Sequence, residues 1–407
     1  MTKRKRNRSL LSMAAGFCCL ALLVSACGAK TDPRFYDNAS VIKQVEKSKA
    51  PDHWPTGDWK TSTPEQQGLN SAALAEWVEG LGNLNLHSFI VIRNGYIVAE
   101  GYNSTTDRQT KQQVKSVTKS ITSALAGLAV SEKKLAGADE TLGDFFPEAA
   151  QDATKAHIKL SDLLIMRSGL EWDNTNERSS LEMMSSSNWQ QYILDKPVVA
   201  EPGTTYNYSN GNAHLVGLAV EKATGERLQD YAVPRLFAPL GISNFGWDTD
   251  PQGHSNAAFG LELTSRDMAK IGLLYLQDGE WDGKQVLPKK WVEQTISKGK
   301  DRKYTDGTLG GYGYFWFLKK ISTEQEEPFD SDMFYAAGSE GQRIFVIPGQ
   351  NMIVVLTANN TQDDYMPEKQ LVSLMRAVED TKPLAADAAG EARLAQAVSL
   401  FKTVKDK

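Results

Sequence analysis

The chain has 407 residues, a formal net charge of −5, and 41% apolar and 23% charged residues. These fractions are ordinary for a folded protein, so they exclude collagen-like, mucin-like and wholly disordered chains. A pI near 5.7 provides no basic footprint for nucleic acid. The length predicts two structural units or one large composite unit, belonging to an enzyme or to a large binding domain.

Residues 1–26 predict a signal peptide. A basic stretch, Lys3 to Arg8, precedes an apolar run from about Leu10 to Ala26, which is the layout of a secretory signal. The run ends in Val24-Ser25-Ala26-Cys27. This ending resembles the lipobox of bacterial lipoproteins, where cleavage before the cysteine leaves it as the lipid-bearing N-terminus. The alternative is an uncleaved membrane anchor, for which the run is at the short limit.

We therefore expect an exported protein, anchored by lipid at Cys27 to the extracytoplasmic face of the cell membrane. All three cysteines, Cys18, Cys19 and Cys27, lie in this leading segment. The mature domain is then without disulfides and without a cysteine-based zinc or iron–sulfur site, and the five histidines show no metal-ligand spacing. We expect no metal and no cofactor.

The remaining chain divides by composition into a lipid tether, a folded domain with a sheet part and a helical part, and an Ala-rich tail. Their expected ranges are 27–58 for the tether, 59–382 for the domain (sheet part 59–140 and 305–382, helical part 141–304) and 383–407 for the tail. The tail has apolar residues at helical spacing, and it either packs on the domain or stays loose.

Periodicity predicts the elements in chain order. A helix is expected over 71–81, followed by two β-rich runs over 88–102 that Asn94-Gly95 separates, which is the strongest short hairpin signal. A helix rich in small residues is expected from Ser116 to about Leu135. Further helices are expected over 160–166, 189–194, 212–223, 228–236, 265–276, 288–296 and 367–379, and strands over 312–318 and 343–358, the latter broken into a hairpin at 348–351. Strands at both ends of a helical middle predict an α/β (α+β) fold, an antiparallel sheet flanked by helices with an inserted, mainly helical domain.

Ser-x-x-Lys is the first candidate catalytic pattern, because residues three apart share one face of a helix. The chain contains five such matches: Ser40/Lys43, Ser116/Lys119, Ser131/Lys134, Ser297/Lys300 and Ser399/Lys402. Ser116 alone opens a helix after a hairpin, where free N–H groups favour an oxyanion. The helix behind it is apolar enough to be buried, and burial lowers the pKa of a lysine until its neutral amine accepts a serine proton. The alternative is a plain helix cap, with Lys119 extended to solvent.

A second candidate segment is the loop Glu201–Gly211, which runs into an apolar helix. Tyr208 on such a loop is able to transfer protons, and Asn210 is able to orient a substrate amide. The alternative is a structural turn with a half-buried tyrosine.

Ser116-Val-Thr-Lys119 followed by Tyr208-Ser-Asn210 resembles the first two motifs of the serine β-lactamase-like family. That family includes penicillin-binding DD-peptidases, class C β-lactamases, esterases, D-aminopeptidases and 6-aminohexanoate-oligomer hydrolases. The resemblance extends over about residues 60–380, through Leu163–Leu170, Pro202-Gly-Thr, Thr264–Lys270 and Asp282-Gly-Lys-Gln. It implies a β-lactamase/penicillin-binding-protein-like fold, Ser116 as the acyl-forming nucleophile, Lys119 as its proton acceptor, Tyr208 as partner acid or base, and Asn210 as a substrate contact.

The third motif of that family, Lys-Thr-Gly or His-Thr-Gly on a late strand, is missing from this chain. Tyr335-Ala-Ala-Gly338-Ser-Glu-Gly341-Gln342 stands in its region and resembles the Gly-rich version of members that are not dedicated β-lactamases. Gly338, Gly341 and Gln342 are therefore expected at the substrate, with Gly338 offering a second oxyanion N–H. The alternative is a bulge without a catalytic part. The missing cation would otherwise bind a substrate carboxylate, so slow β-lactam hydrolysis is expected.

The motifs together predict a serine hydrolase that cleaves a small amide or ester through an acyl-enzyme. The alternative is a non-catalytic surface or cell-wall-binding module that retains the fold. The retained Ser116, Lys119 and Tyr208 favour the enzyme.

Overall fold

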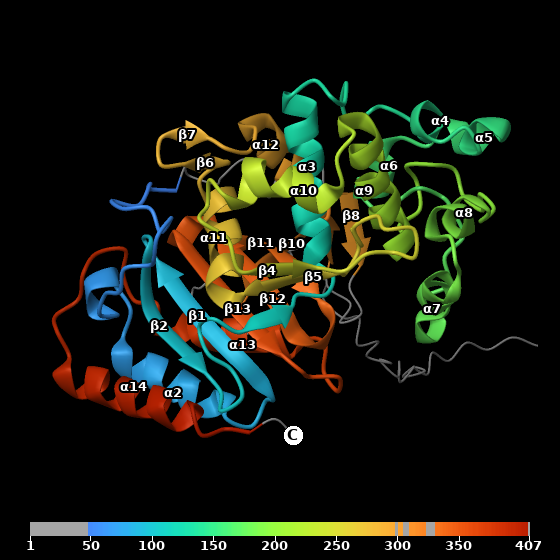
Figure 1. Ribbon diagram of the computed structural model, residues 1–407. Helices are drawn as coiled ribbons and strands as arrows, with labels where there is room; N and C mark the ends of the chain where they lie inside the picture. Colours follow the sequence, from blue (N-terminus) through green and yellow to red (C-terminus); the bar gives the residue numbers. More distant parts are fainter. Residues whose placement is uncertain (1–47, 298–299, 304–308, 323–329, 406–407) are drawn as a thin grey trace, which may run out of the picture. The chain divides into compact units, whose positions relative to one another are not determined.

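An antiparallel sheet of eight strands is the framework of the domain (Figure 1). Its strands, in spatial order, are β2 (Tyr96–Tyr102), β1 (Leu86–Arg93), β13 (Met352–Ala358), β12 (Gln342–Ile347), β11 (Asp330–Gly338), β10 (Phe317–Ser322), β9 (Leu309–Tyr312) and β8 (Lys300–Lys303). Segments from both ends of the sequence thus form one sheet, and the predicted fold class is confirmed.

The computed structural model describes residues 48–297, 300–303, 309–322 and 330–405. The expected signal peptide, Cys27 and most of the expected tether lie outside the described residues. Among the helices that are described, none is both long and apolar enough to cross a membrane.

The β1–β2 hairpin confirms the prediction from Asn94-Gly95. Both turn residues have positive φ, 52° at Asn94 and 86° at Gly95, as a two-residue type I′ turn requires. In β1, Phe89 and Val91 join one hydrophobic cluster, whereas Ile90 and Ile92 join another. Both faces of the strand are therefore buried, which is why it reads as a continuous apolar run.

One face of the sheet is covered by α2 (Ser71–Leu81), α13 (Met366–Leu374) and α14 (Ala388–Phe401). The predicted helix over 71–81 is confirmed, and the Asn70 side chain caps it by accepting from the Ala73 N–H at 2.8 Å. The Ala-rich tail forms α14, which packs along α2 (Figure 1). Arg393 pairs with Glu79 at 2.7 Å, so the tail is part of the fold.

The other face carries α3 (Val117–Ser131) and α11 (Ser265–Leu276), with the helical part beyond them. Its remaining helices are α4 (Leu142–Phe145), α5 (Ala153–Ala156), α6 (Leu160–Leu164), α7 (Arg178–Ser185), α8 (Trp189–Leu194), α9 (Asn210–Thr224), α10 (Leu228–Ala232) and α12 (Lys289–Ser297). A small sheet has the strand order β3 (Lys111–Gln113), β5 (Leu261–Thr264) and β4 (Phe245–Trp247). Its strand β3 directly precedes α3 in the chain.

Two element predictions are corrected. The predicted strand over 312–318 is wrong, because β9 ends at Tyr312 and β10 begins at Phe317. Between them Phe315 has φ 61°, and the Gly313 N–H donates to Trp316 O at 2.9 Å. A tight turn made almost wholly of buried aromatic residues has the composition of a strand. The helix expected to reach Leu135 ends at Ser131, just before Lys133 with φ 59°.

The end of the expected tether contacts the folded domain. Tyr96 donates a hydrogen bond to Asp52 at 2.6 Å, and the Trp281 indole donates to Thr56 at 2.8 Å. The indole rings of Trp54 and Trp281 lie 5.2 Å apart. The packed part of the chain therefore includes residues within 49–58.

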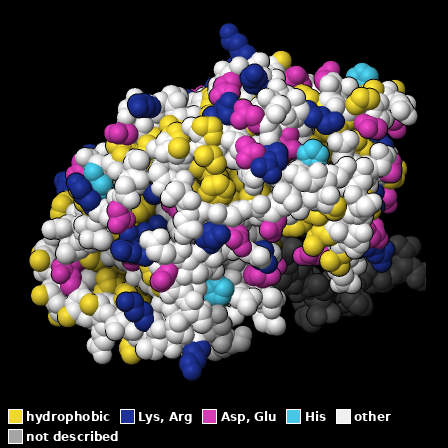
Figure 2. All heavy atoms as spheres, viewed as in Figure 1, with side chains coloured by type: hydrophobic (Ala, Val, Ile, Leu, Met, Phe, Trp, Pro, Cys, Tyr) yellow, Lys and Arg dark blue, Asp and Glu magenta, His cyan; other side chains and the backbone are white. Residues whose placement is uncertain are grey.

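On the face shown in Figure 2, acidic and basic side chains are interspersed.

Candidate active site

Ser116 lies between β3 and α3, as the residue immediately before the first turn of α3. Lys115 before it has φ 52°, which makes a tight turn into the helix. The Ser116 hydroxyl makes no capping hydrogen bond to the helix, so the plain-cap alternative is wrong. Among the described residues, no acceptor is found for the Ser116 N–H, which leaves this donor available to an oxyanion at the positive end of the helix.

Lys119 lies one helical turn further and is only 1% exposed. The alternative in which its side chain extends to solvent is therefore wrong. Its Nζ lies 2.8 Å from Ser116 Oγ, 2.7 Å from Asn210 Oδ1 and 2.8 Å from Ala258 O. Burial lowers the pKa of Lys119 well below the ordinary value of a lysine, and the negative charge of Glu177 opposes this shift.

These three contacts determine how a neutral Lys119 is oriented. A neutral amine has two hydrogens and one lone pair. Asn210 Oδ1 and Ala258 O are carbonyl oxygens, so each accepts a hydrogen bond and neither donates one. When they take the two hydrogens, the lone pair faces the Ser116 hydroxyl. The geometry is that of a base ready to accept the serine proton.

Tyr208 lies beside the amine, with its ring centroid 5.0 Å from Lys119 Nζ. Its backbone is held by the Asn174 side chain, which donates to Tyr208 O at 2.9 Å. The neighbouring Asn207 N–H donates to Met166 O at 2.8 Å. The predicted loop thus places a half-buried tyrosine beside the serine–lysine pair.

Asn210 is the first residue of α9, and both ends of its amide are engaged. The oxygen accepts from Lys119, and Nδ2 donates to Ser180 Oγ on α7 at 2.8 Å. In this structure Asn210 therefore orients the lysine. The resemblance implied a substrate contact and did not point to this role.

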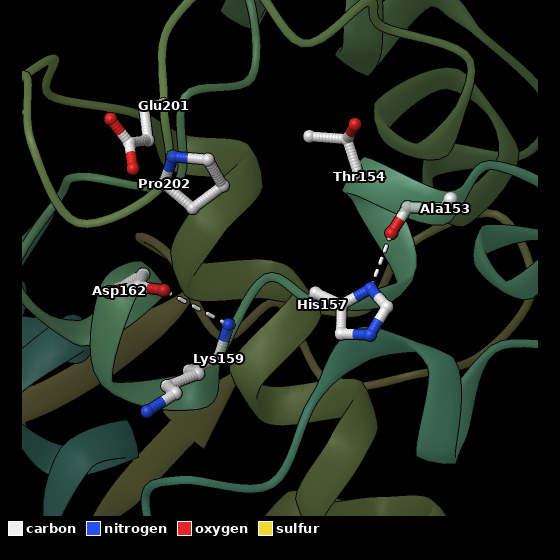
Figure 3. Close-up of a pocket in the computed structure, with 7 residues that line it drawn as sticks. All are labelled: Ala153, Thr154, His157, Lys159, Asp162, Glu201 and Pro202. Atoms are coloured by element: carbon white, nitrogen blue, oxygen red, sulfur yellow. Dashed lines mark hydrogen bonds between the residues drawn. The ribbon is translucent and has the colours of Figure 1, made fainter.

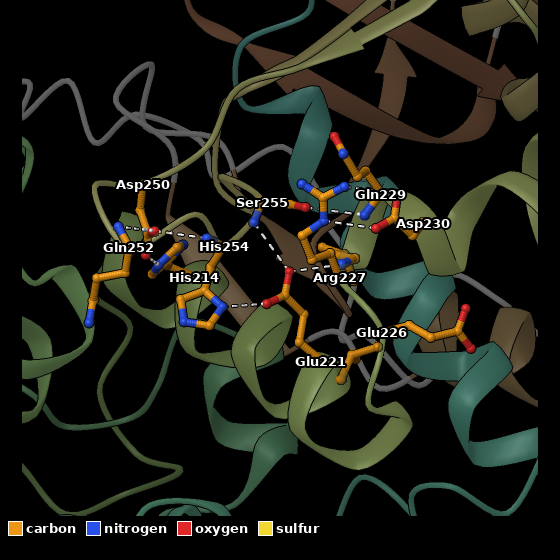
Figure 4. A network of polar contacts seen from close by, with 12 residues as sticks. His214, Glu221, Glu226, Arg227, Gln229, Asp230, Asp250, Gln252, His254 and Ser255 are labelled. Carbon is orange, nitrogen blue, oxygen red and sulfur yellow. Dashed lines mark hydrogen bonds and ion pairs between the residues drawn. The ribbon is translucent and has the colours of Figure 1, made fainter.

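Ala258, the second acceptor of the lysine, lies in the irregular segment 248–260 between β4 and β5. Two pairs tie this segment to α9: His214 Nε2 with Asp250 Oδ2 at 3.2 Å, and His254 Nδ1 with Glu221 Oε2 at 2.6 Å (Figure 4). Burial acts to raise the pKa of Asp250, but the hydrogen bond from His214 is among the contacts that hold it below its ordinary value. Asn210 is the first residue of α9, and Ala258 lies in the segment that these two pairs attach to α9. The pairs therefore fix the two acceptors of Lys119 relative to each other.

The Gly-rich segment expected to replace the third motif is brought to the site by the end of β11. A side chain at Gly338 would collide with Val114 O and lie 2.9 Å from Lys115 Cβ. Only glycine permits this approach to the turn that presents Ser116. Gly338 therefore lies against the turn that presents Ser116, and its role as a second oxyanion donor stays a prediction.

Gly341 and Gln342 are placed differently from the expected substrate contacts. Gly341 has φ 99° in the turn between β11 and β12. The Gln342 amide is buried and donates to Ala358 O on β13 at 2.5 Å, so it is directed into the sheet. Arg343 was not identified from the sequence, and its guanidinium donates to Gly338 O at 2.7 Å while pairing with Glu368 at 2.9 Å.

The other Ser-x-x-Lys matches lack this environment. Ser131 is exposed at the end of α3 and donates to Leu128 O, and Lys134 is exposed. Ser399 and Lys402 are exposed near the end of α14, Ser297 is exposed at the end of α12, and Ser40/Lys43 lies outside the described residues.

A hollow of about 550 Å³ in the helical part is separate from these groups (Figure 3). It is lined by Ala153, Thr154, His157, Lys159, Asp162, Glu201 and Pro202. None of the residues gathered around Ser116 lines it.

Comparison with known proteins identifies the family of the chain. The family model for Beta-lactamase matches residues 74–374. The 6-aminohexanoate-dimer hydrolase of Paenarthrobacter ureafaciens is 24% identical over 288 residues, which cover 66% of this chain and 71% of that protein.

Two solved structures share the fold. A Bacillus anthracis protein assigned as a 6-aminohexanoate-dimer hydrolase has a TM-score of 0.64 at 20% identity, over 81% of this chain and 89% of that chain. EstCE1, a hydrolase with promiscuous acyltransferase activity, has a TM-score of 0.62 at 18% identity, over 76% of this chain and 99% of that chain. The extent of the family match shows that this chain belongs to the beta-lactamase family of serine hydrolases.

Proposed function

We propose that the protein is an exported, lipid-anchored serine hydrolase that cleaves a small amide or ester through an acyl-enzyme on Ser116. The observation that carries the catalytic part is the position of Lys119 Nζ, buried and 2.8 Å from Ser116 Oγ. The relatives support the bond class, because one is named for hydrolysis of an amide dimer and another for hydrolase and acyltransferase activity.

In the first half-reaction, Ser116 Oγ attacks the substrate carbonyl carbon while its proton passes to Lys119 Nζ. The negative charge that develops on the carbonyl oxygen is stabilised by the Ser116 N–H and by a second N–H from Gly338. The tetrahedral intermediate collapses when the bond to the leaving group breaks. The leaving amine or alcohol takes the proton from Lys119, directly or through the Tyr208 hydroxyl.

In the second half-reaction, water attacks the acyl-enzyme. Lys119 or Tyr208 accepts a proton from the water, and the carboxylic acid product leaves as the proton returns to Ser116 Oγ. The residues thus end in their starting protonation states, and the net reaction is hydrolysis.

A covalent serine probe tests the enzyme against a non-catalytic binding module. We expect a fluorophosphonate to label the detergent-solubilised full-length protein once, with peptide mass spectrometry locating the adduct on Ser116. A panel of linear amides, short-chain esters and D-amino-acid peptides then identifies the substrate class. Failure of several serine-directed probes to label the folded protein would support the binding module.

Export and lipidation at Cys27 rest on the sequence, since Val24-Ser25-Ala26 precedes the only cysteine that the mature chain retains. We expect incorporation of a labelled fatty acid into the wild-type protein grown in a bacterial host. The Cys27→Ala variant should lose the label and the membrane fractionation together. Equal labelling of the two proteins would contradict the proposal.

A further inference from the structure

An ion pair joins the turn before Ser116 to the Gly-rich segment that stands in the region of the missing third motif. Lys115 immediately precedes Ser116, and Glu340 lies two residues after Gly338. The distance from Lys115 Nζ to Glu340 Oε2 is 3.2 Å, and the two side chains are 27% and 31% exposed. The two residues of the pair thus lie within two positions of Ser116 and of Gly338 along the chain, and both side chains are partly exposed to solvent.

Both residues belong to tight turns and have positive φ, 52° at Lys115 and 64° at Glu340. Such a conformation is uncommon for residues other than glycine, and the surrounding fold must maintain it. The ion pair joins the turn that presents Ser116 to the turn that follows Gly338. It thus connects the two segments that are expected to supply the oxyanion donors.

The two buried cations near this pair, Lys119 and Arg343, are bound to other groups. Lys119 is buried and holds Ser116 Oγ, Asn210 Oδ1 and Ala258 O. Arg343 is buried and engaged with Glu368 and with Gly338 O. Among the described residues, Lys115 is a partly exposed cation next in sequence to the nucleophile, and Glu340 pairs with it.

We infer that the Lys115–Glu340 pair determines substrate specificity, selecting neutral acyl groups against those that carry a carboxylate. A substrate carboxylate that approaches Lys115 must displace Glu340 or remain beside it as a like charge. Both alternatives cost binding free energy. A neutral acyl group encounters neither cost. This inference rests on the proposed function, since it concerns the substrate that Ser116 attacks.

The test compares a neutral and an anionic ester that share one leaving group, p-nitrophenyl butyrate and mono-p-nitrophenyl glutarate. In the Glu340→Gln variant Lys115 is freed, and kcat/KM for the anionic ester should rise about tenfold, mainly through KM, which corresponds to about 1.4 kcal/mol. The neutral ester reports any general effect on the two segments that the pair joins, so the anionic-to-neutral ratio of kcat/KM should rise about tenfold. Nitrocefin, an anionic β-lactam, should be a poor substrate of the wild-type protein and a better one of Glu340→Gln.

Two further variants separate local from general effects. Adding Lys115→Met to Glu340→Gln should abolish the gain on the anionic ester. Glu262→Gln is the matched control, because Glu262 pairs with Lys111 at 3.3 Å and is 33% exposed, and the substitution changes the net charge by the same amount. It should leave the anionic-to-neutral ratio unchanged.

An unchanged ratio in Glu340→Gln, or an equal rise in Glu262→Gln, would overturn the inference while the wild-type protein still hydrolyses esters. Absence of all turnover and of probe labelling in the wild-type protein would instead contradict the proposed function. Efficient nitrocefin hydrolysis by the wild-type protein, exceeding that of both esters, would show that another cation serves the carboxylate.

Discussion

Ser116→Ala is expected to reduce turnover of any ester or amide substrate by a factor on the order of 10⁴ or more, because loss of the nucleophile removes the covalent route. The change deletes one hydroxyl whose described partner is Lys119 Nζ, so the fold should persist. Initial rates at substrate concentrations around KM, together with circular dichroism and a thermal melt, measure both effects.

Ser131→Ala is the matched control, since Ser131 also begins a Ser-x-x-Lys match on α3. Its hydroxyl donates to Leu128 O at 2.8 Å near the exposed end of the helix. We expect wild-type activity and a change in the free energy of unfolding within about 0.5 kcal/mol. Loss of activity in Ser131→Ala with retention in Ser116→Ala would refute the assignment of the nucleophile.

The acylation rate is expected to rise with pH along a limb whose midpoint lies well below the roughly 10.4 of a free lysine. Below the pKa of Lys119 in the folded protein, Nζ is protonated and has no lone pair for the serine proton. Above it the amine is neutral, so the rate rises with pH through that value. Burial lowers this pKa, so the base is available at a lower pH than an exposed lysine. Pre-steady-state acylation, followed by the burst of p-nitrophenol, gives the profile.

Glu177→Gln sharpens this test. The charge of Glu177 raises the pKa of Lys119 against the effect of burial, so its removal should move the midpoint to lower pH. Lys119→Met should reduce acylation by a factor of about 10²–10⁴, as expected for loss of a general base. Tyr208 lies beside the amine, so the midpoint belongs to the interacting groups together. A midpoint near 10.4, or a shift to higher pH in Glu177→Gln, would contradict the assignment of Lys119 as the base.

The local elements were predictable from the sequence because they depend on near neighbours. Asn94-Gly95 specifies the hairpin turn through positive φ, and apolar spacing specifies α2 between its cap at Asn70 and its end at Leu81. Ser-x-x-Lys places a serine and a lysine on one helical face wherever a helix forms. The motif order then identified the family.

Local patterns fail where buried residues form an irregular path. The aromatic residues between Tyr312 and Phe317 are as fully buried as the residues of a core strand. Their composition therefore predicts one continuous strand, although the chain turns there. The hydrophobic effect is non-directional, and it does not distinguish a buried turn from a buried strand.

The sequence already singled out Ser116 among the Ser-x-x-Lys matches, but only the tertiary structure decided which groups orient its base, Lys119. Asn210 and Ala258 are 91 and 139 residues from Lys119, and the contribution of Ala258 is a backbone carbonyl, which every residue has. The same holds for Gln342, whose amide bonds to β13, and for the pairing of Lys115 with Glu340, which are 225 positions apart. Burial and hydrogen-bond partners are properties of the folded chain. For this protein, residue type and spacing therefore determined the candidate nucleophile and base, and long-range packing determined which groups hold and orient them.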